Sequence, residues 1–186
     1  MRGLVAVVLL ALGASGCGYN TIQVNDEAAS AAKQQIEVQL QRRADLVGNL
    51  VETVKGQAAQ EFAVFTEVAR ARSGLTSAIE GGSPQAMANA NEGLTTAIRG
   101  LSIAVEAYPQ IKSDAAFLRL QDELAGTENR VAVARTDYNE AVQKHNTFIR
   151  RFPYVITAKI TGAGAREYFE VTDPSARTAP KVDFSK

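Results

Sequence analysis

The feature that most constrains this chain is a helical pattern that runs from about Asn25 to Ile79 without a proline. Apolar or small residues recur there at steps of three and four, or of seven where one position is skipped, which is the seam of a helix packed along its length. The seam residues are Ile36, Leu40, Ala44, Val47, Val51, Val54, Ala58, Phe65, Val68, Leu75 and Ile79. The pattern predicts one long helix over residues 25–79, with Asn25 or Asp26 as its N-cap and bends at Gly48 and Gly56.

Two further helices and a short fourth segment follow. Ser83 and Pro84 form a helix-start signal, and Pro109 ends the helical pattern that they open. Ser113 and Asp114 open a third pattern that runs to Phe152-Pro153. Residues 154–161 form a short fourth helix or a turn. These patterns predict an all-α fold: an elongated antiparallel helical bundle with one long N-terminal helix, two further long helices and a short fourth element.

The first residues form an export signal. Residues 4–12 are an apolar run that is too short to span a bilayer as a permanent helix but has the length of a signal-peptide core. Ala14-Ser15-Gly16-Cys17 resembles a bacterial lipobox, in which the cysteine is lipidated, for example by palmitate, and becomes the mature N-terminus. We therefore assign residues 1–16 to a lipoprotein signal peptide and residues 17–24 to a tether. The alternatives are a soluble export signal that contains a cysteine, and an uncleaved anchor.

The remaining residues divide into a helical bundle over 25–161 and a C-terminal tail over 162–186. Gly162-Ala163-Gly164 breaks the last helix. Residues 167–171 are expected to lie extended against the bundle, and Phe184 is a candidate anchor of the tail.

Composition excludes several functional classes. Lys plus Arg and Asp plus Glu both number 20, so the basic excess expected of a nucleic-acid binder is missing. Cys17 is the single cysteine and His145 the single histidine, which leaves no disulfide, no Ser/His/Asp or Cys/His catalytic set and no Glu-x-x-His di-metal pair. We therefore predict no enzymatic activity, no cofactor and no metal. His145 is interpreted as a surface or packing residue.

Charged residues interrupt two of the seams. Glu61 and Arg72 fall on the seam of the first helix, and Glu128 and Arg135 fall on the seam of the third. If the helices run up-down-up, the first and third are parallel and the four side chains form a partly buried polar network that fixes register. If the third helix runs the other way, Glu128 faces Arg42 and Arg43 instead of Arg72.

A second polar set lies on the same two helices. Asp45 and Asn49 share one helix face, as do Asn139 and Asn146. These amides pair across helices or cap carbonyls at a bend, or else they belong to a polar recognition surface. The candidate interaction face comprises Arg42, Arg43, Asp45, Asn49, Asn139 and Asn146.

One set of residues, spread over nearly the whole mature length, matches a known pattern: Tyr19-Asn20, Arg42 to Leu46, Asn49 to Val51, Val54-Lys55, Glu61, Val68 to Arg72, Tyr108-Pro109, Phe117, Leu120-Gln121, Glu128, Ala134-Arg135, Tyr138-Asn139, Val142, Asn146, Ile149, Phe152-Pro153, Tyr168-Phe169, Pro180 to Val182 and Phe184. In these residues the chain resembles the LemA family of bacterial envelope proteins. Many members carry a proline where this chain has Gly48, and many begin with a transmembrane segment, so this chain looks like a lipoprotein variant. The resemblance implies a membrane-anchored helical bundle and supplies no reaction.

Together these features predict a lipid-anchored helical bundle outside the cytoplasm, on the periplasmic face or the cell surface, that acts as a scaffold or through a protein partner or self-association. The alternative is a ligand-binding module. The helix over residues 84–107 is too short to cover all the apolar surface of Leu46, Val47, Leu50 and Val51. These four residues would then line a groove for lipid or peptide.

Overall fold

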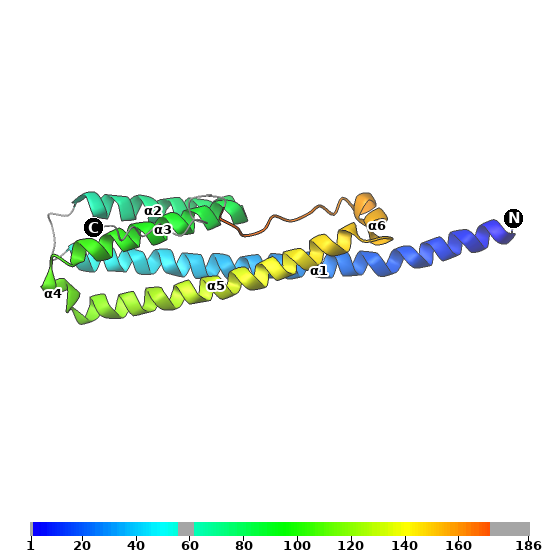
Figure 1. Ribbon diagram of the computed structural model, residues 1–186. Coiled ribbons are helices and arrows are strands. Elements are labelled where there is room, and N and C mark those ends of the chain that lie inside the picture. The colour runs from blue at the N-terminus through cyan, green and yellow to red at the C-terminus, as the bar shows by residue number, and fades with distance from the viewer. Residues whose placement is uncertain (1, 56–61, 172–186) are drawn as a thin grey trace, which may run out of the picture. The chain divides into compact units, whose positions relative to one another are not determined.

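The computed structural model describes residues 2–55 and 62–171 of the chain. Six helices are found in these ranges, and no strand is found there. They are α1 (Arg2–Lys55), α2 (Phe62–Gly81), α3 (Pro84–Val105), α4 (Pro109–Lys112), α5 (Ala115–Arg150) and α6 (Tyr154–Thr161) (Figure 1). The all-α prediction is therefore confirmed.

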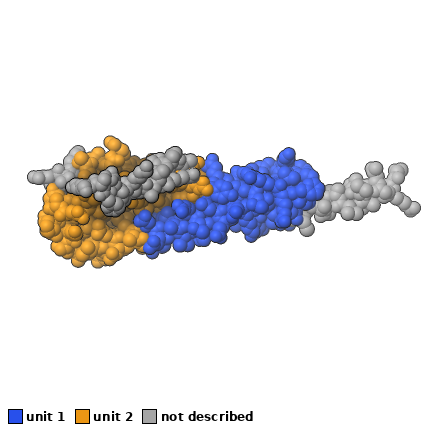
Figure 2. All heavy atoms as spheres, in the orientation of Figure 1, with its two compact units in different colours: residues 1–39, 128–168 blue, residues 40–127, 169–186 orange. Residues whose placement is uncertain are grey.

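The chain divides into two compact units (Figure 2). Unit 1 comprises Met1–Gln39 and Glu128–Tyr168, and unit 2 comprises Leu40–Thr127 and Phe169–Lys186. Helices α1 and α5 each contribute residues to both units. Residues 172–186, which include most of the predicted tail and Phe184, lie outside the described residues.

Unit 2 corrects the prediction of one helix over residues 25–79. Gly48 of α1 and Arg72 of α2 lie side by side, because a Cβ built on Gly48 would stand 3.0 Å from the guanidinium carbon of Arg72. In one straight helix, residues so far apart in sequence would be separated by about 36 Å. Helix α2 therefore packs back onto α1 and is not its straight continuation. The seam residues of both helices share one core, which is why periodicity alone did not reveal this packing.

Local signals placed the later helices of unit 2 correctly. The Ser83 side chain accepts a hydrogen bond from the Ala86 N–H at 3.3 Å, as expected for the N-cap of α3. Asp114 caps α5, since its Oδ1 accepts from the N–H groups of Ala116 at 2.8 Å and Phe117 at 3.0 Å. Between α3 and α5 the chain makes the single turn of helix α4, which starts at Pro109.

The core of unit 2 is apolar and draws on every helix of that unit. Its fully buried side chains include Val47, Leu50, Val54, Val68, Leu75, Met87, Leu94, Leu101, Ile111 and Phe117. Leu46 and Val51 are buried as well, at 9% and 6% exposure. The apolar excess that suggested an open groove is therefore covered, because α2 supplies the packing surface that the sequence had assigned to the continuation of α1.

In unit 1, α1 and α5 run antiparallel. Near one end, Asp26 of α1 lies 3.8 Å from the His145 ring of α5. Near the other, Gln39 of α1 lines a groove together with Asn129 and Arg130 of α5. Residue numbers along α5 decrease as those along the facing α1 increase, so the two helices are antiparallel. This is the second of the two directions left open by the sequence, in which the third predicted helix is not parallel to the first.

Residues 18–24, assigned to a tether from sequence, are instead part of α1. Gly18 is buried against the Tyr154 ring, and Ile22 packs with Ile149 and Ala158 in a small apolar cluster. Asn25 and Asp26 consequently lie inside the helix and not at its N-cap. The physical reason is tertiary: α5 and α6 supply a packing surface for this stretch that no local signal could reveal.

After α6 the chain continues in extended form. Gly162 has a φ of 72°, which ends the helix in the left-handed conformation that glycine tolerates. The following residues, 163–168, complete unit 1 and are called the strap below.

Candidate functional site

The strap is held by three polar side chains of α5, namely Tyr138 and, two turns further on, the adjacent pair His145 and Asn146. The Tyr138 hydroxyl donates to the Glu167 carbonyl at 2.7 Å. Asn146 pairs with the backbone of Arg166 on both sides, donating to its carbonyl at 2.9 Å and accepting its N–H at 2.8 Å. The His145 Nε2 lies 3.0 Å from the Gly164 carbonyl, and because a carbonyl only accepts, this nitrogen carries the proton.

These α5 side chains are buried. Tyr138 and His145 are each 1% exposed and Asn146 is 5% exposed. Burial raises the pKa of the Tyr138 hydroxyl, which keeps it a neutral donor. A buried polar group that lacks a hydrogen-bond partner lowers the stability of the fold by about 1–3 kcal/mol. The strap backbone therefore supplies partners that these buried side chains need.

Two side chains of helix α1 bind the side chain of Arg166 in the strap. The Arg166 Nε donates to Asp26 Oδ1 at 2.7 Å, and its Nη2 donates to Ser30 Oγ at 2.8 Å. The hydrogen bond from Arg166 lowers the pKa of the Asp26 carboxyl, and the same bond raises the pKa of the Arg166 guanidinium. Together, Asp26, Ser30, Tyr138, His145 and Asn146 form what we call the clamp.

The sequence indicates only part of the clamp. Asn146 was assigned to a polar face, His145 to the surface or packing, and Asp26 to a helix cap, while Arg166 carried no signal at all. One signal was present: the apolar seam of α5 at Tyr138, Val142 and Ile149 is interrupted by the adjacent pair His145-Asn146. Two buried polar residues in a seam require a polar partner, although the sequence does not say which segment supplies it.

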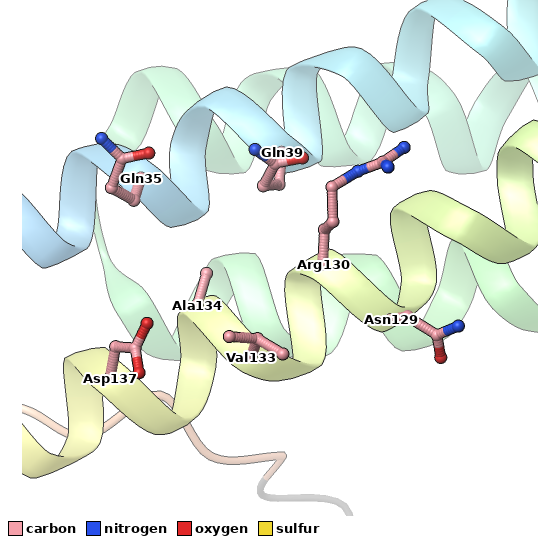
Figure 3. A pocket seen from close by; sticks show the side chains of 7 residues that line it. All are labelled: Gln35, Gln39, Asn129, Arg130, Val133, Ala134 and Asp137. Carbon is pink, nitrogen blue, oxygen red and sulfur yellow. The ribbon is translucent and has the colours of Figure 1, made fainter.

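A shallow groove lies between α1 and α5 in unit 1 (Figure 3). Its volume is about 510 Å³, and its lining residues are Gln35, Gln39, Asn129, Arg130, Val133, Ala134 and Asp137. Figure 3 shows Gln35 and Gln39 on α1 and the other five lining residues on α5, with the Arg130 side chain extending toward α1. The Gln39 Oε1 atom is buried and has no hydrogen-bond partner among the described residues.

Unit 2 holds a buried cation. Arg43 is 2% exposed, and it donates to Asn91 Oδ1 at 2.7 Å and to Thr95 Oγ1 at 3.0 Å, both on α3. Its prediction as part of an exposed interaction face is therefore wrong, and the same holds for Asn146, which is buried in the clamp. Arg42, Asp45 and Asn49 are exposed on α1, and Asn139 is half-buried on α5.

The predicted polar network does not lie on the buried seams. Arg72, Glu128 and Arg135 are all exposed, and Glu61 lies outside the described residues. In each case the preceding small residue takes the seam position: Ala71 is half-buried, Thr127 is 0% exposed and Ala134 is 7% exposed. A heptad pattern does not specify which of two adjacent residues is buried on the seam. Because burying a charged side chain costs desolvation free energy, the small residue is buried and the charged one is exposed.

No group of three or more His, Cys, Asp or Glu side chains arranged for a metal ion occurs among the described residues. No helix in the described part of the chain is long and apolar enough to cross a membrane.

The amino-acid sequence of the chain is similar to those of three magnetosome proteins. The Magnetosome proteins MamQ 1 and MamQ 2 of Paramagnetospirillum magneticum are each 30% identical to the chain over 175 residues, which cover 82% of this chain. Magnetosome protein MamQ of Magnetospirillum gryphiswaldense is 30% identical over 174 residues, or 81% of this chain. The match spans 64% of the length of each relative.

A family model describes the same region. The model of the LemA family matches residues 32–184, which include α2 to α6, most of the packed part of α1 and the strap. The match extends over well more than half of the chain and agrees with the resemblance carried by the residues quoted above. The chain therefore belongs to the LemA family.

Proposed function

We propose that this protein is anchored by a lipid on Cys17 to a membrane of the cell envelope, on its non-cytoplasmic side, and that it acts there as a non-enzymatic scaffold or interaction protein. The observation that carries the proposal is the short distance in sequence between the lipobox and the packed unit. Gly18 is already buried against Tyr154, and Ile22 is 1% exposed. A lipid on Cys17 would thus hold unit 1 at the bilayer surface and not at the end of a flexible stalk.

The use made of the polar side chains supports a structural role. Tyr138, His145 and Asn146, the residue types that an active site could employ, engage the backbone of the chain itself. Arg43 engages side chains of α3. Family membership supports a helical module of the envelope, and the relatives' names associate them with the magnetosome. From those names we carry over only an association with a cellular structure.

The lipid anchor is tested by metabolic labelling with an alkyne-tagged palmitate. The wild-type chain should take up the label, and the Cys17→Ser variant should not. Ser15→Ala is the matched control, because a small residue remains before the cysteine and labelling should persist. Uptake of the label by Cys17→Ser, or its absence from the wild type, would overturn the anchor.

Fractionation tests whether the anchor decides location. When residues 1–17 are replaced by the leader of a soluble exported protein, the chain should move from the membrane fraction to the soluble fraction. If it remains in the membrane fraction without lipid, the bundle itself binds the membrane or a membrane protein, and Cys17 is dispensable for location. An interaction role predicts that crosslinking in intact cells captures a specific protein, or a second copy, on the wild-type chain.

A further inference from the structure

We propose that the clamp is a peptide-binding site that the strap occupies in cis: it takes an extended peptide of small residues that carries one arginine. The contacts are of the kind that recognise main chain. Three of the clamp side chains bind carbonyl or N–H groups of Gly164, Arg166 and Glu167, and none of these contacts depends on the strap side chains. Main-chain hydrogen bonds supply affinity for any extended segment in the same way.

Specificity comes from a single subsite. The guanidinium of Arg166 reaches Asp26 at 2.7 Å and Ser30 at 2.8 Å on α1. A charge-assisted hydrogen bond to a carboxylate is about twice as strong as a neutral one. A peptide that replaced the strap would therefore need an arginine at this position and would tolerate small residues before it.

The strap itself is weakly buried. Gly164, Ala165, Glu167 and Tyr168 are exposed, and the next fully buried apolar side chain is Phe169, at 3% exposure. Residues 164–168 thus have little apolar surface holding them in place, and their local opening free energy rests on the clamp hydrogen bonds. Local opening would remove the backbone partners of His145 and Asn146, whose polar groups could then bind the strap again or an equivalent peptide.

Fluorescence anisotropy with a labelled peptide of residues 162–168 tests the site on the full-length chain in detergent. The wild-type chain should bind the peptide weakly, because the strap competes at a high effective concentration. Arg166→Ala weakens the strap in cis and should bind the peptide about threefold to fivefold more tightly. Arg150→Ala, an exposed arginine on α5, is the matched control and should behave like the wild type.

Two further variants confine the binding to the clamp. Adding Asp26→Ala to Arg166→Ala should abolish the gain, and a peptide with alanine in place of its arginine should bind Arg166→Ala less tightly than the arginine peptide does. Equal affinity of the wild type and Arg166→Ala for the peptide, or indifference to Asp26→Ala, overturns the proposal. Circular dichroism establishes that each variant retains its helices.

Hydrogen exchange on the unmodified chain provides an independent test. The amides of residues 164–167 should exchange much faster than the α5 amides of residues 138–146, since strap opening precedes helix unfolding. Protection of the strap equal to that of α5 would show that the site does not open, and this result would also overturn the proposal. Neither measurement involves Cys17, so a failed lipid anchor and a failed peptide site are distinguishable.

Discussion

Units 1 and 2 both contain parts of α1 and α5, yet different kinds of interaction hold the remaining elements of each unit in place. In unit 2 the additional elements are amphipathic helices, and the core is a continuous set of aliphatic and aromatic side chains. In unit 1 the additional element beyond α6 is an extended strap that is held through hydrogen bonds from the clamp. Helices that share an apolar seam need no specific polar contacts, whereas an extended segment has backbone groups that need partners.

The arginines of the two units illustrate the same difference. Arg43 in unit 2 is 2% exposed and donates to side-chain oxygens of Asn91 and Thr95. Arg166 in unit 1 has a side chain that is 26% exposed and pairs with Asp26, whose own side chain is 42% exposed. A buried cation is costly to strand, whereas a partly exposed ion pair is screened by water and stabilises little. Stability should therefore depend far more on Arg43, and site specificity on Arg166.

The largest effect is expected at Arg43. Arg43→Ala should lower the free energy of unfolding by about 3 kcal/mol, because it leaves a cavity and removes the donors to Asn91 and Thr95. Urea denaturation followed by circular dichroism measures the loss, and hydrogen exchange should place it in unit 2. Arg42→Ala, the exposed neighbour, should change stability by no more than about 0.5 kcal/mol. Similar losses for both variants would contradict the contrast.

Asn146 should show the corresponding dependence in unit 1. Asn146→Ala removes both hydrogen bonds to Arg166 and should cost about 2 kcal/mol of local stability. Hydrogen exchange should show deprotection of the strap with the α2 and α3 amides unchanged. Gln143→Ala, on the exposed side of α5, is the control and should leave strap protection as in the wild type. Equal deprotection of α2 and α3 would mean that the two units unfold as one.

The close approach of α1 to α6 gives a smaller effect. A Cβ at Gly18 would lie 2.6 Å from Cδ1 of Tyr154, whose ring is stacked on Phe148 with the centroids 4.2 Å apart. Gly18→Ala should therefore destabilise unit 1 by about 1 kcal/mol despite its better helix propensity. Gly100→Ala is the matched control in unit 2, because a Cβ there meets no atom within 4 Å, and it should raise the melting temperature. A stabilised Gly18→Ala variant would show that Tyr154 moves aside freely.

The smallest effect is the acid dependence of the Asp26–Arg166 pair. The folded pKa of Asp26 lies below its usual value of 3.8, so its contribution is fully present above about pH 4 and is lost as the pH falls through the lowered folded pKa. Unit 1 should lose protection in this acidic range, and Asp26→Asn should remove that part of the pH dependence while lowering stability at neutral pH. Hydrogen exchange of the strap at several pH values measures both. An unchanged pH profile in Asp26→Asn would assign the acid sensitivity to another carboxyl.

The strongest signals in the sequence were the helix caps and the apolar seams. Capping residues identified the starts of α3 and α5 to within a residue, since Ser83 and Asp114 satisfy N–H groups that lie next to them in sequence. Seam periodicity identified the buried faces at Leu94, Leu101 and Val131. It failed by one residue at Arg72, Glu128 and Arg135, where a small neighbour occupies the seam instead.

Only part of the clamp could be predicted from the amino-acid sequence. The His145-Asn146 pair in the α5 seam indicates a buried polar requirement, and the Gly162-Ala163-Gly164 breaker indicates an extended segment after the last helix. Their meeting depends on the return of the chain through α6, and the choice of Arg166 and Asp26 as partners depends on the register between the strap and α1. Neither depends on local sequence.

The amino-acid sequence by itself determined the helical class, the helix starts after Ser83 and Asp114, and family membership, because local hydrogen bonds and the 3.6-residue period are properties of neighbouring residues. Tertiary structure alone decided that α2 packs back onto α1, that residues 18–24 are packed helix, and that Arg43, His145 and Asn146 are buried. The physical reason is that burial is a property of surfaces distant in sequence: an apolar seam specifies that it will be covered and leaves open which segment covers it.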